Sequence, residues 1–201
     1  MKQKLTKIQP QGSMRFHTYL GDNAGCGHIR VIFPSLMLNQ FKYKGMNFGS
    51  TYNSYFTNDP KYYDNLSFVK FQRSMTDGQL QCIRLVKCIQ ESSKAGFGVI
   101  YEVDDLITDE IPETNSASKY YKEAFPIIKE ILSIVDGVTV STETLKKEIL
   151  KYNKNVQVIP NRLCKWLWNS NKNNKIENYK PRILWAGSQN HFDKDKGGRR
   201  F

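Results

Sequence analysis

The chain has 201 residues, of which 39% are hydrophobic and 12% aromatic, and this composition excludes a disordered chain. No stretch reaches the length of about 18 uninterrupted apolar residues that a membrane-spanning helix needs. Residues 1–12 are polar and lysine-bearing and lack the apolar core of a secretory signal, so we expect a cytoplasmic protein.

The net charge of +11 is unevenly distributed along the sequence. Residues 1–100 carry 13 Lys and Arg against 5 Asp and Glu, whereas residues 101–201 carry 17 against 14. Such an excess favours a polyanionic partner, which would be nucleic acid, nucleotide phosphates or an anionic membrane surface. Because the basic residues are scattered and form no dense block, a solvated basic surface is the alternative interpretation.

Strands and helices are predicted to alternate along the chain. Apolar runs indicate strands at 14–20, 66–71, 99–103, 138–140 and 156–159. Helical patterns cover 28–40, 77–94, 115–133 and a stretch from 141 or 142 to 152. The alternation predicts an α/β fold with a Rossmann-like, mostly parallel sheet flanked by helices.

Two prolines and one polar stretch leave local alternatives open. Pro34 would make the first helix begin later or kink, and Pro126 allows either one kinked helix or two helices. Residues 45–65 are rich in Gly, Asn, Ser and Tyr, which predicts a long loop or a short hairpin region.

The last part of the chain predicts a second domain. Residues 169–180 are polar and asparagine-rich, as in a linker, and 182–186 (RILWA) form a fresh apolar run followed by a Gly-Ser turn. A lone strand cannot bury both of its faces, so either it joins the preceding sheet or it begins a second domain, and we favour the second alternative. We therefore expect a first domain over 1–168, a linker over 169–180 and the truncated start of a second domain over 181–201.

The four cysteines argue against a metal or redox site. Cys26, Cys82, Cys88 and Cys164 are irregularly spaced, and none belongs to a C-x-x-C pair. Reduced thiols in a cytosolic fold are the preferred interpretation. We therefore expect no metal ion and no bound cofactor.

A glycine-containing turn lies between the first strand and the first helix. Gly25 and Gly27 would let backbone N–H groups approach a ligand closely, and the helix that follows favours negative charge. His28 and Arg30 would add positive charge against a leaving diphosphate. The alternative is that the glycines only make a tight turn, since the spacing is not G-x-G-x-x-G.

Acidic residues follow two further strands. Asp104 and Asp105 end the 99–103 strand, where α/β folds place their binding crevices, and one of them could act as a catalytic base. Capping of the next turn is the alternative. Glu143 is a second candidate for the same cleft, whereas Ser141 or Thr142 is expected to cap a helix. Asn161 is expected to hold the crossover to the second domain through side-chain hydrogen bonds.

Several of these segments occur in an order that resembles the GT-B glycosyltransferases, especially the retaining GT4 family and glycosyltransferases of tailed phages. The segments are 25–30 (GCGHIR), 101–105 (YEVDD), 138–146 (VTVSTETLK), 158–161 (VIPN), and 181–188 (PRILWAGS) with Lys196-Gly197. In this family two Rossmann-like domains face each other, the first mostly holding the acceptor and the second the sugar nucleotide. The resemblance implies a nucleotide-sugar co-substrate, no obligatory metal and a location in a bacterial or phage-infected cell.

The resemblance also assigns roles in the second domain. It implies that Gly187, Ser188 and Lys196 belong to a donor-phosphate site, with the lysine neutralising the diphosphate. The acceptor hydroxyl stays open between a modified DNA base, a surface glycan and a protein. Because most of the donor domain would lie beyond residue 201, a catalytically inactive Rossmann-like module is the alternative function. A nicotinamide-dependent enzyme is disfavoured because the full dinucleotide fingerprint is absent.

Overall fold

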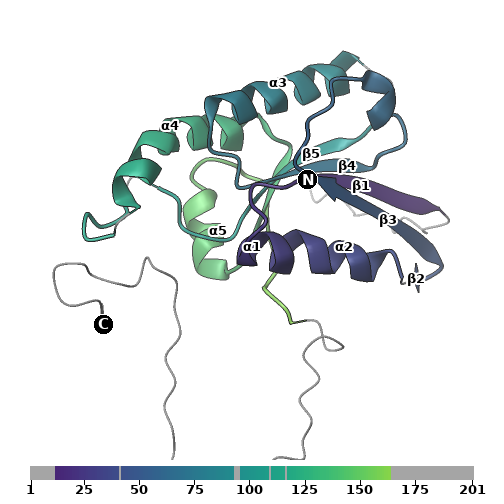
Figure 1. Cartoon of the computed structure of the whole chain (residues 1–201), viewed down its shortest axis with the longest axis horizontal. Coiled ribbons are helices and arrows are strands. Elements are labelled where there is room, and N and C mark those ends of the chain that lie inside the picture. The colour runs from purple at the N-terminus through teal and green to yellow at the C-terminus, as the bar shows by residue number, and fades with distance from the viewer. Residues whose placement is uncertain (1–11, 41, 93–95, 109, 116, 164–201) are drawn as a thin grey trace, which may run out of the picture. The chain divides into compact units, whose positions relative to one another are not determined.

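The computed structural model describes residues 12–40, 42–92, 96–108, 110–115 and 117–163 (Figure 1). The strands are β1 (Ser13–Tyr19), β2 (Lys42–Tyr43), β3 (Met46–Asn53), β4 (Phe68–Gln72), β5 (Gly98–Val103), β6 (Gly137–Val140) and β7 (Val156–Val158). The helices are α1 (Gly25–Gly27), the π-helical segment η1 (His28–Ile32), α2 (Phe33–Leu38), the 3-10 helix η2 (Pro60–Tyr63), α3 (Asp77–Ser92), α4 (Ser118–Ile134) and α5 (Glu143–Ile149).

The chain divides into two compact units. The first runs to Leu106 and resumes from Pro126 to Arg162, and it contains the whole sheet. The second begins at Ile107, includes the residues up to Phe125 and takes up the chain again from Leu163. The expected linker at 169–180 and the expected second-domain start at 181–201 lie outside the described residues.

All seven strands form one sheet in the order β2-β3-β1-β4-β5-β6-β7. The β2–β3 pair is antiparallel, and each of the other five pairs is parallel. This mostly parallel, Rossmann-like sheet with flanking helices confirms the fold class that the alternating pattern predicted. The strands from β4 to β7 pair in chain order because each is joined to the next by a helical crossover.

The chain order of the strands reverses between β1 and β4. From β1 the chain passes through α2 and returns to β3 on one side, whereas from β4 it passes through α3 to β5 on the other. Figure 1 shows α2 and α3 on opposite faces of the sheet. This arrangement defines a topological switch point, and in open α/β sheets ligands bind at the carboxyl ends of the strands beside such a point.

The two faces of the sheet differ in polarity. Residues paired across parallel strands point to the same face, so the registers place a set of polar residues together: Thr18, Lys70, Gln72, Glu102 and Thr139. The opposite face is apolar and carries the buried side chains of Val69, Phe71, Val99, Tyr101, Val103, Val138 and Val140. A hydrogen bond from Arg30 of η1 to Glu102 identifies the polar face as the one beneath η1.

The prediction of a long loop or short hairpin region over 45–65 was wrong for its first half. β3 occupies Met46–Asn53 as an eight-residue strand that pairs with β1 along seven positions. Its polar, glycine-containing sequence has weak strand propensity, and the backbone pairing with β1 overrides that weakness. The hairpin was anticipated in part, because β2 and β3 are joined by Lys44 and Gly45 at positive φ.

The helices that contain Pro34 and Pro126 show how each proline is accommodated. Pro34 occupies the second position of α2, which continues directly from η1, and its ring leaves the carbonyl oxygen of Arg30 without the usual N–H four residues on. Nζ of Lys70 lies 3.4 Å from that oxygen. Pro126 lies inside α4, which is a single helix.

Thr142 is the residue that caps α5, with its hydroxyl accepting a hydrogen bond from the Leu145 N–H at 3.1 Å. Among the described residues, every helix is too short or too polar to cross a bilayer.

A buried histidine lies on the apolar side of β1. Nδ1 of His17 is 2.8 Å from the Thr51 hydroxyl and 2.9 Å from the Tyr62 hydroxyl, and its ring meets Tyr19 edge to face. Within the described residues, Nε2 has no hydrogen-bond partner. Burial lowers the pKa of His17 from 6.5 to about 4, so the ring is neutral in the folded protein at neutral pH.

Stability is expected to fall as the pH drops from 6.5 towards 4, because the unfolded chain binds a proton at His17 that the folded chain rejects. The loss attributable to this histidine is about 3 kcal/mol. Urea unfolding at a series of pH values measures it. The His17→Gln variant should show a shallower pH dependence across this window, and equal slopes for the two proteins would contradict the assignment.

Candidate functional site

Six loops leave the carboxyl edge of the parallel strands in the described part of the chain. Those after β1, β4, β5, β6 and β7 contain most of the sequence-predicted residues that the structure describes. The loops after β1 and β4 flank the switch point. The candidate site is therefore the carboxyl edge from β1 to β5, all of which belongs to the first compact unit.

The side chain of Asp22 closes the glycine-containing turn through hydrogen bonds to its backbone. Oδ1 of Asp22 accepts hydrogen bonds from the N–H of Ala24 at 2.8 Å and of Gly27 at 3.2 Å. A Cβ at Gly27 would lie 2.0 Å from the Asp22 carbonyl oxygen, whereas one at Gly25 would meet nothing within 4 Å. Gly27 is therefore required by the turn itself, and Gly25 leaves open space beside the backbone.

Arg30 is buried and ties η1 to the strands beneath it. Its Nε donates to Oε1 of Glu102 at 2.6 Å, and its Nη1 donates to the carbonyl oxygen of Ile159 and to Oδ1 of Asn161 at 3.1 Å. Asn161 thus makes a side-chain hydrogen bond to Arg30 of the first unit, and the expected crossover to a second domain lies outside the described residues. Arg30 forms a buried ion pair with Glu102, and its side chain is only 4% exposed. It therefore does not face an open cleft.

A second cation lies beside Arg30. The side chain of Lys70 is half-buried, and burial lowers its pKa, with Glu102 acting in the opposite direction. Burial raises the pKa of Glu102, and Arg30 and Lys70 counteract that rise. The two cations around one carboxylate form a charged layer between η1 and the sheet, in which Glu102 is the central residue.

Asp104 and Asp105 lie together at the end of β5, as their sequence positions predicted. Nη1 of Arg73 is 3.6 Å from Oδ1 of Asp104, 3.0 Å from Oδ2 of Asp105 and 3.1 Å from Sγ of Cys26. We call these four residues the carboxyl-edge cluster. Its members come from the loops after β1, β4 and β5, so the cluster spans the switch point.

The two aspartates differ in their surroundings. The Asp104 side chain is 6% exposed and that of Asp105 is 59% exposed. Partial burial raises the pKa of Asp105, the neighbouring Asp104 raises it further, and Arg73 opposes both. Burial and the adjacent Asp104 raise the pKa of the Cys26 thiol to about 12, so this thiol is protonated at neutral pH. Asp105 is therefore the member that offers an accessible basic oxygen.

The cluster also brings three potential metal ligands together. One ligand atom each from Cys26, Asp104 and Asp105 lie within 4.8 Å of one another. The guanidinium of Arg73 contacts all three and already compensates their charge. A cation would have to displace it, so the arrangement favours an arginine-bridged polar cluster.

The remaining candidates are placed at different positions. Glu143 begins α5 on an exposed surface at the same edge of the sheet, after β6. His28 is half-buried, with Nδ1 2.9 Å from the Ala24 carbonyl oxygen. The Ser141 hydroxyl donates to the Asp104 carbonyl oxygen at 2.8 Å and so fixes the start of the β5 loop. Gly187, Ser188 and Lys196 lie outside the described residues.

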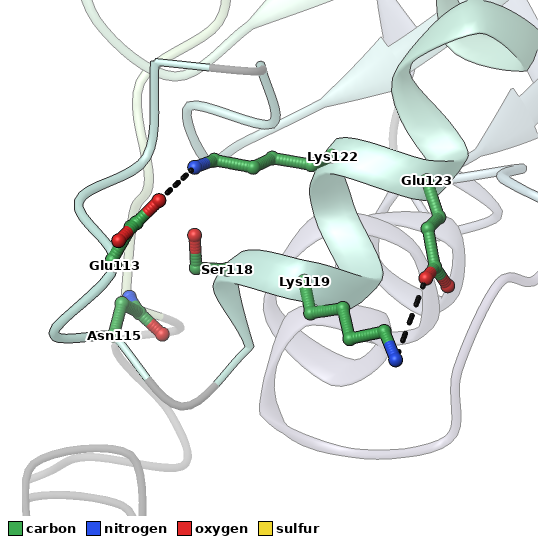
Figure 2. Close-up of a pocket in the computed structure, with 6 residues that line it drawn as sticks. All are labelled: Glu113, Asn115, Ser118, Lys119, Lys122 and Glu123. Carbon is green, nitrogen blue, oxygen red and sulfur yellow. Dashed lines mark hydrogen bonds and ion pairs between the residues drawn. The ribbon is translucent and has the colours of Figure 1, made fainter.

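A hollow of about 610 Å³ is found in the second unit, at the start of α4. Figure 2 shows its lining residues, which are Glu113, Asn115, Ser118, Lys119, Lys122 and Glu123. Lys122 pairs with Glu113 at 3.3 Å, and Lys119 with Glu123 at 3.9 Å. Because its charged groups are paired with one another and largely exposed, we place the candidate site at the carboxyl edge of the sheet.

Sequence reasoning missed two cations of the site, Arg73 and Lys70, and two carboxylates, Asp22 and Glu102. Arg73 follows β4 directly, in the same position relative to its strand as Asp104 relative to β5, and this is a signal that could have identified it. Asp22 lies in the turn that was examined for its glycines. Lys70 and Glu102 lie inside apolar strands, where a charged residue indicates a buried partner.

Comparison of the sequence with protein-family models and with curated proteins, and of the structure with solved structures, finds no match. The fold and the geometry of the carboxyl edge are therefore the observations on which a function can be argued.

Proposed function

We propose that this chain carries the acceptor-side domain of a GT-B-type glycosyltransferase, which moves a sugar from a nucleotide-sugar to an acceptor hydroxyl. In the proposal the carboxyl-edge cluster lies beside the acceptor, and a donor-binding second domain completes the active site. A cytoplasmic location, where nucleotide-sugars are made, belongs to the same proposal. The ordered resemblance of the segments from 25–30 to 181–188 supports it, together with the Rossmann-like sheet.

The observation that carries the proposal is the accessible carboxylate of Asp105 at the switch point. In sugar transfer, the acceptor oxygen bonds to the anomeric carbon as the bond to the diphosphate breaks. The hydroxyl proton passes to a base, and Asp105 is the exposed carboxylate placed to receive it. Asp104 is almost fully buried and orients the loop through the Ser141 hydrogen bond to its carbonyl.

The charge of the site favours a neutral acceptor. Asp104 and Asp105 lie against the guanidinium of Arg73, Asp22 also acts on Asp105, and the Cys26 thiol is protonated. In the proposal this excess of carboxylates disfavours a phosphate group of the acceptor beside Asp105, and the donor diphosphate is held by the second domain. Among the acceptors left open by the sequence, a glycan hydroxyl fits this edge better than a DNA backbone does.

One observation favours a second candidate, a non-catalytic Rossmann-like binding module. The N–H groups at the start of α1 are occupied by Asp22, and Arg30 is neutralised by Glu102. The glycine turn therefore offers fewer free donors to a diphosphate than a glycosyltransferase would use. In this alternative the same edge binds a ligand without transferring a group.

Turnover of nucleotide-sugars by this chain joined to a complete donor-binding domain, with replacement of Asp105, tests the proposal. Donor hydrolysis and transfer to glycan acceptors are measured across UDP- and GDP-sugars. Asp105→Asn should lower kcat by about 100-fold or more because it removes the proposed base. Asp64→Asn, which changes an exposed aspartate at the end of η2, is the matched control and should leave kcat unchanged.

Two results would count against the enzyme. Equal turnover of the wild type and Asp105→Asn would remove the role given to this carboxylate. Saturable binding of a sugar or nucleotide-sugar, with no product from any donor, would favour the binding module.

A further inference from the structure

Arg73 occupies an unusual position in the backbone. It follows β4 directly with a φ of 47°, a left-handed conformation that non-glycine residues rarely adopt. Its N–H donates to the carbonyl oxygen of Glu102 at 2.9 Å, which anchors the residue to the end of β5. A Cβ at Gly21 would lie 2.2 Å from the Gln72 carbonyl oxygen and 3.2 Å from Cβ of Arg73, so the ends of β1 and β4 also touch here.

This backbone conformation directs the side chain into the carboxyl-edge cluster. The Arg73 side chain is 13% exposed, and its Nη1 reaches Asp104, Asp105 and Cys26 at 3.6, 3.0 and 3.1 Å. These three residues come from two different loops, and Arg73 from a third. Strained backbone at such a point is typical of functional sites, where the surrounding contacts hold the residue in place.

We propose that Arg73 is the positioning residue of the carboxyl-edge cluster, holding the Asp105 carboxylate at the end of β5 where it meets the acceptor hydroxyl. This inference rests on the proposed function for the identity of the group that Asp105 meets. It adds the residue that sets the orientation and the charge of that carboxylate.

The charges that face Asp105 explain why a cation is needed. Asp104 precedes it in the β5 loop, Asp22 approaches from the β1 turn, and both disfavour a second ionised carboxyl group. The thiol of Cys26 is neutral and gives no compensation. Arg73 is the cation that opposes them at Asp105, so its removal leaves Asp104 and Asp22 to act on Asp105 without compensation.

The titration of the Asp105 carboxyl carbon, followed by NMR in the full chain, tests the inference without any substrate. Arg73→Gln should move the midpoint up by about one pH unit, since an opposite charge near an aspartate lowers its pKa by at least that amount. Arg73→Lys should bring the midpoint most of the way back, because it restores the charge. Arg84→Gln is the matched control, since Arg84 pairs with Glu130 on an exposed surface away from the cluster.

An unchanged or lowered midpoint in folded Arg73→Gln would overturn the inference. A midpoint in Arg73→Lys as high as that in Arg73→Gln would also overturn it, since the effect would then follow from altered structure. If Arg73→Gln does not fold, Arg73→Gly takes its place, because glycine adopts the observed φ without strain and still removes the guanidinium. The same criteria apply to that variant.

The titration separates the failure of this inference from the failure of the proposed function. If the Asp105 midpoint shifts in Arg73→Gln but the protein turns over no nucleotide-sugar, the positioning role of Arg73 stands and the proposed sugar transfer is rejected. If the protein turns over nucleotide-sugars but the Asp105 midpoint is unchanged by replacement of Arg73, the reaction stands and the positioning role is rejected.

Discussion

Arg30→Met is expected to lower the free energy of unfolding by about 3 to 5 kcal/mol, since it removes one partner of a buried ion pair and leaves the other charged. The side chain of Glu102 is 1% exposed and receives Nε of Arg30 at 2.6 Å. The same substitution frees the carbonyl of Ile159 and the side chain of Asn161. Chemical denaturation of the wild type and the variant measures the loss.

A double variant separates the loss of the Arg30–Glu102 ion pair from the cost of leaving the buried Glu102 carboxylate without Arg30. Arg30→Met combined with Glu102→Leu removes both charges, and apolar pairs of similar volume are often close to neutral in stability. Much of the loss should therefore be recovered in the double variant, although Lys70 then loses its nearby carboxylate. A double variant as unstable as Arg30→Met would show that the contacts to Ile159 and Asn161 dominate.

Gly27→Ala is the second substitution with a large expected effect, a loss of about 3 kcal/mol in stability. The added Cβ would lie 2.0 Å from the Asp22 carbonyl oxygen and 3.4 Å from its Oδ1, so the turn that Asp22 closes would have to open. The usual gain from alanine in a helix, about 1 kcal/mol, is too small to offset this clash. Thermal unfolding followed by circular dichroism measures the change.

Gly25→Ala is the matched control, since it makes the same change two residues earlier. A Cβ there meets nothing within 4 Å, so stability should change by less than about 1 kcal/mol. Similar losses in the two variants would contradict the different roles that the turn geometry assigns to the two glycines. Reduced turnover in stable Gly25→Ala would point to a ligand that approaches this backbone closely.

The strands of the apolar core could be predicted because their apolar sequences indicate burial. Runs such as 99–103 and 138–140 lie in central strands and are mostly apolar, with one polar residue in each, and such short apolar runs indicate buried strands. β3 could not be predicted in the same way, because most of its residues are polar or glycine and its backbone pairs with a strand 34 positions earlier in the chain. Pairing between distant segments leaves no local signal when the side chains are polar.

The candidate site was predictable where a residue follows its own strand. Asp104 and Asp105 were recognised because they end a compact apolar run. The contact of Arg30 with Glu102 joins residues 72 positions apart, and that of Arg73 with Cys26 joins residues 47 apart. Neither contact has a sequence spacing that a motif could describe, so the role expected for Arg30 at a diphosphate could not be weighed against its burial.

The two edge strands of the sheet have a consequence for the behaviour of the protein at high concentration. A sheet edge exposes unpaired N–H and C=O groups that another chain can join. Among the described residues one edge is β2, with two residues that include Lys42, and the other is β7, with three. Both are too short to template an extended intermolecular sheet. Along the longer β3, β2 pairs with Met46 and Asn47, and the side chain of Asn39 occupies the backbone N–H and C=O of Ser50, so part of the free side of β3 is already bonded.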